Sequence, residues 1–118
     1  MGKNLQIPSV NLKADLPSVR EALARLDSEL ARARSHKSPA LKVIHGYGST
    51  GVGGDIRIAA QKRLVELTAE GRIRGCIFGE DWSKSDEATW KVLQAHPEWK
   101  EEADLGRRNA GITIVLLD

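Results

Sequence analysis

The sequence contains 118 residues, of which 41% are hydrophobic and 29% are charged. This size suits one globular domain with a modest core and leaves no room for a second domain. The single cysteine, Cys76, excludes an intrachain disulfide and is typical of proteins in a reducing compartment. The sequence has no apolar run like that of a signal peptide or a membrane span, so we expect a cytoplasmic protein without a membrane partner.

The charge is distributed unevenly along the chain. The net charge is +2, but residues 80–104 carry eight acidic side chains and three lysines, which is a net of −5. The rest of the chain therefore carries +7. This positively charged part of the chain can bind a polyanion such as nucleic acid, or it can be an ordinary solvated surface.

The N-terminal part of the chain predicts a strand followed by a helix. Residues 6–12 alternate weakly between apolar and polar positions, and Pro8 within them favours an edge strand. Ser18 and Glu21 have the spacing of a capping box, and the apolar residues that follow recur at helical spacing. We therefore expect an amphipathic helix that ends at about Arg34.

Three further apolar strands are predicted at residues 41–44, 73–78 and 111–117. A second amphipathic helix, which ends before Gly71, connects the first two of them. This order of elements implies right-handed crossovers. The predicted fold is therefore an α/β two-layer sandwich, with a four-stranded, mainly parallel sheet, two helices and a helical insertion before the last strand.

The insertion covers residues 80–105 of this predicted single domain and is called the acidic segment below. Trp82, Trp90 and Trp99 lie in or beside it. We expect these tryptophans to pin the segment to the body of the domain. A base-stacking platform is an alternative that the surrounding negative charge disfavours, and a contact surface for a protein partner is another.

The stretch HGYGSTGVGG, residues 45–54, joins a predicted buried strand to a predicted helix. Its five glycines leave backbone N–H groups unobstructed, and the N-terminus of a helix favours anions. We therefore interpret the stretch as a phosphate-binding loop, with side-chain hydroxyls and one guanidinium as further donors. The candidate phosphate-binding residues are His45, Gly46, Tyr47, Gly48, Ser49, Thr50, Gly51, Gly53, Gly54 and Arg57.

Gly46, Gly48 and Gly51 also match the G-x-G-x-x-G pattern of dinucleotide-binding loops. That fingerprint expects an acidic residue about 20 positions later, at the end of the next strand. Here the spacing falls on Glu66 and Glu70, in or at the end of the predicted second helix. Nucleotide binding is therefore disfavoured, and no cofactor is expected.

His45 is a candidate catalytic residue, because an imidazole can donate or accept a proton near neutral pH. It directly follows a predicted strand and precedes the glycines. The other two histidines, His36 and His96, show no metal-ligand spacing with Cys76 or with a cluster of carboxylates. No metal site is predicted.

The segment LKVIHGYGSTGVGGDIR, residues 41–57, resembles the central motif of the small MutS-related, or Smr, domain. In that motif an apolar strand ends in His-Gly-x-Gly, followed by Thr-Gly and an arginine in the next helix. Residues 18–30 and 109–117 are similar to the family's first helix and last strand. The resemblance implies a fold like the C-terminal domain of translation initiation factor three, with binding or cleavage of DNA or RNA.

The family's second motif, Leu-Asp-x-His or Leu-Asp-x-Arg on the first strand, is altered here. Its best counterpart is residues 10–14, where Asn11 replaces the aspartate and Lys13 replaces the histidine or arginine. An amide cannot act as a base, and a lysine with a pKa near 10.4 is a poor proton acceptor at neutral pH. Lys13 can still hold a phosphate.

Three functions follow from these observations. We favour binding of DNA or RNA through Lys13, the loop at residues 45–54 and Arg57, with weak or no cleavage. The alternative is a metal-independent endonuclease in which His45 moves the proton and Lys13 stabilises developing charge on phosphorus. The third is a protein-interaction module that uses the acidic segment.

Overall fold

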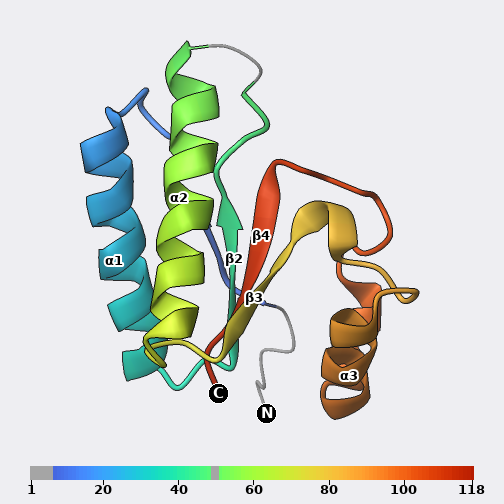
Figure 1. Ribbon diagram of the computed structural model, residues 1–118. Helices are drawn as coiled ribbons and strands as arrows, with labels where there is room; N and C mark the ends of the chain where they lie inside the picture. The colour runs from blue at the N-terminus through green and yellow to red at the C-terminus, as the bar shows by residue number, and fades with distance from the viewer. Residues whose placement is uncertain (1–6, 49–50) are drawn as a thin grey trace.

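The computed structural model describes residues 7–48 and 51–118 (Figure 1). In chain order the elements are β1 (Ser9–Asn11), α1 (Val19–Ser35), β2 (Ala40–Ile44), α2 (Gly51–Ala69), β3 (Gly75–Phe78), η1 (Gly79–Asp81), α3 (Glu87–Ala95), η2 (Pro97–Glu101) and β4 (Ile112–Leu116). They agree within a few residues with the predicted helices and strands. Within the described ranges, no helix is long and apolar enough to cross a membrane.

The sheet is mixed, so the prediction of a mainly parallel sheet is wrong. The strand order is β1-β2-β4-β3, and among these described strands only β1 and β2 pair in parallel. β4 lies between β2 and β3 and is antiparallel to both. The chain leaves β3 and enters β4 at the same end of the sheet, where Phe78 pairs with Thr113. The acidic segment connects these two strands without crossing the sheet, so they are antiparallel. An apolar run predicts a strand but not its direction.

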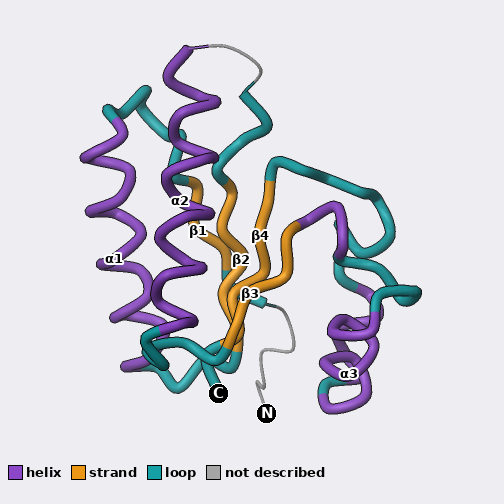
Figure 2. Tube along the Cα trace, viewed as in Figure 1, coloured by secondary structure: helices purple, strands orange, loops and turns teal. Residues whose placement is uncertain are grey.

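The sheet is covered on both faces. α1 and α2 lie side by side on one face, and α3 lies on the other (Figures 1 and 2). The first core is built from α1, α2 and one sheet face, with Leu26, Leu64 and Val43 fully buried. The second core includes Leu93 of α3 and Ile114 of β4. The acidic segment thus adds a layer to the predicted two-layer sandwich.

Two of the three tryptophans pin the acidic segment to the sheet, as predicted. Trp82 is 0% exposed and Trp99 is 4% exposed, and both belong to the second core. Trp90 is 43% exposed, so the prediction that it also anchors the segment is wrong. Trp90 lies on the outer side of α3, where Lys100 places its ammonium 5.8 Å from the ring centroid.

A partly buried ion cluster strengthens the same attachment. Lys42 of β2 pairs with Glu102, at 3.0 Å between Nζ and Oε2, and with Asp104. Glu102 also accepts a hydrogen bond from the Trp82 indole N–H, at 2.9 Å. Burial of Lys42 lowers its pKa, but the hydrogen bonds to Asp104 and Glu102 outweigh this effect and raise the pKa overall.

The predicted capping box starts α1. The Ser18 hydroxyl accepts a hydrogen bond from the Glu21 backbone N–H, and the Glu21 carboxylate accepts one from the Ser18 backbone N–H. The hydrogen bond from the Ser18 backbone N–H to the carboxylate is the largest of the effects that lower the pKa of Glu21. The box fixes where α1 begins, and therefore which side chains of its first turns reach the end of β1.

Candidate functional site

The predicted loop lies at one end of the sheet, where several chain segments meet. Residues 45–48 follow the last residue of β2, and the turn at residues 12–15 follows β1. The connection that enters β4 reaches the same end of the sheet (Figures 1 and 2). The site is therefore built from segments that are distant in sequence.

His45 is the buried centre of this site. Its side chain is 0% exposed, its Nδ1 lies 3.0 Å from the carbonyl oxygen of Gly46, and its Nε2 lies 2.9 Å from the Thr113 hydroxyl. A carbonyl oxygen only accepts hydrogen bonds, so Nδ1 carries the proton and donates it, and Nε2 accepts from the Thr113 hydroxyl. Both ring nitrogens are thus engaged within the protein.

Burial lowers the pKa of His45 below the ordinary value of 6.5. The hydrogen bond to Gly46 opposes this effect, and the positive charges of Arg57 and Lys13 add to it, while the negative charge of Glu80 opposes it. The imidazole is therefore neutral at neutral pH. It contacts the loop backbone from inside the protein as an uncharged group.

Backbone contacts hold the first part of the loop against the start of β4. The backbone N–H groups of His45 and Gly46 both donate to the carbonyl of Gly111, at 3.0 and 2.9 Å. Gly46 has φ +79° and Gly48 has φ +49°, a left-handed conformation that favours glycine. A Cβ on Gly54 would lie 2.5 Å from the carbonyl oxygen of Gly48, so the start of α2 also approaches the loop closely.

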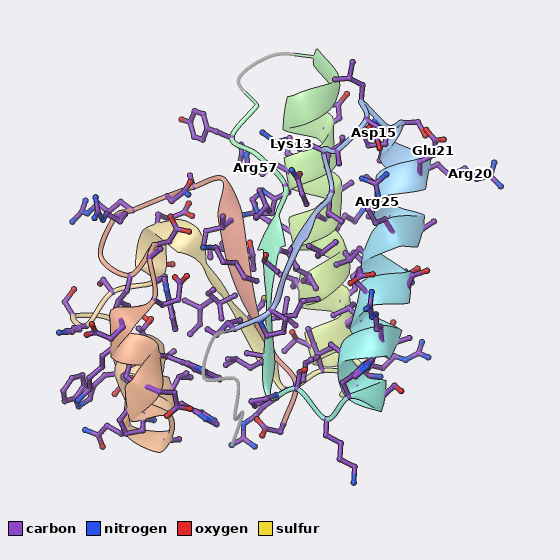
Figure 3. All side chains as sticks on the ribbon, turned by 180° about the vertical axis from the view of Figure 1, so that it is seen from behind. Lys13, Asp15, Arg20, Glu21, Arg25 and Arg57 are labelled. Carbon is purple, nitrogen blue, oxygen red and sulfur yellow. The ribbon has the colours of Figure 1, made fainter. Side chains whose placement is uncertain are left out.

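Two cationic side chains converge on this loop. A Cβ on Gly46 would collide with the Lys13 side chain, which shows that Lys13 lies directly along the loop backbone. Arg57 of α2 donates from Nε to the carbonyl of Tyr47 at 3.1 Å. Figure 3 shows Lys13 and Arg57 near each other at this end of the sheet. The ammonium and guanidinium groups therefore flank the same stretch of bare backbone.

Asn11 shapes the turn that carries Lys13. Its side-chain oxygen accepts a hydrogen bond from the Lys13 backbone N–H at 2.9 Å. This bond forms a turn that both asparagine and aspartate favour. The amide at this position thus has a structural partner within the turn.

Sequence reasoning missed two residues that organise the site. Arg25 of α1 donates from one guanidinium nitrogen to the carbonyls of Asn11, Leu12 and Ala14, at 3.0 to 3.3 Å, and so ties the turn to α1. Thr113 holds His45 from 68 positions away. A hydroxyl side chain inside the apolar run at residues 111–117 was the available signal for Thr113, but nothing in the sequence marked Arg25.

The structure brings together most of the predicted site residues, which are Lys13, His45, Gly46, Tyr47, Gly48, Gly54 and Arg57. Gly51 and Gly53 lie in the first turn of α2. Ser49 and Thr50 lie outside the described residues. In the parts of the chain that the structure describes, no three His, Cys, Asp or Glu side chains gather as a metal site would require.

No protein-family model and no curated protein matches the sequence. One solved structure is similar over 95% of this chain and 99% of its own: the Smr domain of Thermus thermophilus MutS2, with a TM-score of 0.59 and 21% sequence identity. The chain has the fold of an Smr domain. The resemblance that residues 41–57 suggested is thus confirmed at the level of the fold.

Proposed function

We propose that this chain binds nucleic acid through the phosphates of one strand, at the end of the sheet where Lys13, the loop and Arg57 meet. The observation that carries the proposal is the convergence of two cations, from separate elements, on a glycine-rich backbone. A polymer with regularly spaced phosphates is the ligand that matches this chemistry. The Smr-like fold of the chain is consistent with this proposal.

The state of Asn11 and His45 favours binding over cleavage. Asn11 offers an amide that already bonds within its turn. His45 is buried, and both ring nitrogens have partners inside the protein. General acid–base catalysis requires a titratable group within hydrogen-bond reach of the proton that it moves. In this proposal His45 shapes the phosphate-binding loop, and the endonuclease alternative requires the loop to open and expose His45.

Salt-dependent binding tests the proposal. Labelled RNA and DNA oligonucleotides should bind with an affinity that falls steeply with salt, because cations that neutralise phosphates release counterions. Lys13→Gln and Arg57→Gln should each weaken binding and reduce the slope of log K against log salt by about 0.7 to 0.9. The comparison between RNA and DNA decides which polymer the site prefers.

Matched controls come from cations elsewhere on the molecule. Lys91 is exposed on α3, which covers the sheet face opposite α1 and α2, and Arg34 is exposed near the end of α1. Lys91→Gln and Arg34→Gln remove the same charges as the two test variants. They should change the salt slope less than Lys13→Gln and Arg57→Gln do. An affinity that does not change with salt, or an equal loss of affinity in all four variants, would contradict a localised phosphate site.

Cleavage is measured on the same oligonucleotides and on supercoiled plasmid. The proposal predicts little or no cleavage by the unchanged protein. Efficient cleavage that His45→Ala abolishes, while binding persists, would favour the endonuclease. Absence of nucleic-acid binding even at low salt would instead favour a protein partner, with the exposed Trp90 as the first surface residue to test.

A further inference from the structure

Two apolar side chains project beside the proposed phosphate-binding residues. Leu16 is 95% exposed and Tyr47 is 62% exposed, and within the described ranges these are the two most exposed large apolar side chains. Leu16 lies three residues after Lys13 in the same turn, and Tyr47 directly follows the glycine along which Lys13 lies. Apolar groups so close to paired cations present a ligand surface that is both charged and hydrophobic.

The Leu16 side chain is held outward by a strained backbone. Asp15 has φ 64° and Leu16 has φ 51°, a left-handed conformation that costs free energy in residues with a Cβ. The Leu16 N–H donates to the Lys13 carbonyl at 3.2 Å, and Arg25 binds carbonyls of the same turn. Figure 3 shows Lys13, Asp15 and Arg25 together at this end of the molecule. The exposed side chain gains no packing that offsets the strain, and its surface remains available to a ligand.

The Tyr47 ring is an exposed aromatic surface beside Arg57. The Tyr47 carbonyl accepts a hydrogen bond from Arg57, whose guanidinium carbon lies 5.8 Å from the ring centroid. The left-handed Gly46 and Gly48 on either side set the direction of the backbone. An aromatic ring beside a guanidinium is the combination that stacks a base and holds a neighbouring phosphate.

We propose that Tyr47 stacks on an unpaired base and that Leu16 inserts between bases, so that the site selects nucleic acid with unpaired or unstacked bases over a continuous duplex. The inference rests on the proposed function. A continuous duplex presents phosphates but hides the faces of its bases. Only the two cations would therefore contribute to binding it. Exposed faces occur in single strands, loops, bulges and junctions, where aromatic side chains stack and apolar wedges enter.

Three oligonucleotides of equal length test this selectivity: a single strand, a duplex with a central bulge and a continuous duplex. The unchanged protein should bind the first two more tightly than the third. Tyr47→Ala and Leu16→Ala should each weaken binding to the first two by about fivefold or more, and binding to the continuous duplex by less than about twofold. Tyr47→Phe should keep most of the selectivity, because it keeps the ring.

The controls and the readouts separate this inference from the proposed function. Trp90→Ala and Val65→Ala remove exposed apolar surface elsewhere and should change neither affinity nor selectivity. Loss of stacking should lower affinity without changing the salt slope, whereas Lys13→Gln changes the slope. A fluorescent base analogue at the bulge should report stacking by quenching in the unchanged protein, and less quenching in Tyr47→Ala.

Because both side chains are exposed, the two alanine variants should unfold at the same temperature as the unchanged protein. If they bind all three oligonucleotides as tightly as the unchanged protein, or weaken all three equally, the inference is overturned. If Lys13→Gln still lowers affinity and slope in that case, phosphate binding stands alone. If no oligonucleotide binds at low salt, both proposals fail.

Discussion

Replacing Lys42 by methionine should destabilise the protein at neutral pH and much less in acid. The ammonium of Lys42 neutralises Glu102 and Asp104, and the three side chains keep only 12%, 12% and 21% of their surface exposed. Lys42→Met removes the cation but keeps the length of the side chain. Two carboxylates then remain close together, in a partly buried position, without a partner.

The size of the effect follows from this burial. Breaking a fully buried ion pair by removing one partner costs about 3–5 kcal/mol. Residual exposure of the three side chains lets water screen the carboxylates, so we expect a loss of about 2–3 kcal/mol. For a chain of this size the loss corresponds to a fall in the melting temperature of about 10 °C.

The pH dependence gives the prediction its sharpest form. Burial of Asp104 raises its pKa, but hydrogen bonds from Lys42 and Asn109 outweigh this effect and hold the pKa below its ordinary value of 3.8. A carboxyl whose pKa is lower in the folded state stabilises the protein above its unfolded pKa, and this contribution is lost as the pH falls through the folded pKa. The gap between Lys42→Met and the unchanged protein should therefore narrow as the pH falls below 3.8.

Urea unfolding followed by tryptophan fluorescence measures both quantities, since the buried Trp82 and Trp99 report on this attachment. A second variant that combines Lys42→Met with Glu102→Gln and Asp104→Asn should recover part of the loss, because it removes the unpaired charges. The reasoning is refuted if Lys42→Met unfolds at the same urea concentration as the unchanged protein. It is also refuted if the loss is equally large in acid and at neutral pH.

Two further predictions concern the chemistry of the site. Burial lowers the pKa of His45 below 6.5. As the pH falls below 6.5, the unfolded state therefore binds more protons than the folded state, and the unfolding free energy should decrease. In His45→Gln the unfolding free energy should decrease less over the same pH range, and urea titrations between about pH 7.5 and about pH 5.5 measure this. A decrease as large as that of the unchanged protein would contradict the prediction. The double variant Asn11→Asp with Lys13→His introduces the first-strand residue types that the resemblance to the Smr motif implies, and it should raise cleavage without raising affinity. Cleavage rate and binding are compared on one substrate, and a double variant that cuts no faster would show that the first strand is not what limits cleavage.

The sequence predicted the elements of this fold because their signals are local. The capping box at Ser18 and Glu21, the apolar run before His45 and the glycines that follow it are each readable within a few residues. The direction of β4 was not readable, since it depends on how the whole acidic segment returns to the sheet. The same holds for the outward position of Trp90, which depends on how α3 is turned against the second core.

The composition of the candidate site was predictable, but the arrangement of its members was not. Lys13, His45 and Arg57 could be selected from the sequence as phosphate-binding or catalytic types. The burial of His45 depends on Thr113, and the support of the Lys13 turn depends on Arg25, which is 11 to 14 residues away in sequence. Contacts of this kind come from tertiary packing, and no periodicity or motif encodes them.

The central position of β4 also determines when this protein can fold during synthesis. Of the strands that the structure describes, β4 comes last in the chain, yet it takes part in two of the three pairings among them and supplies residues to both cores. Until β4 is available, β3 has no partner among the other described strands, and β2 has only the three-residue β1 among them. The sheet therefore cannot close until β4 has left the ribosome, and until then the nascent chain exposes the apolar faces that β4 covers in the finished sheet.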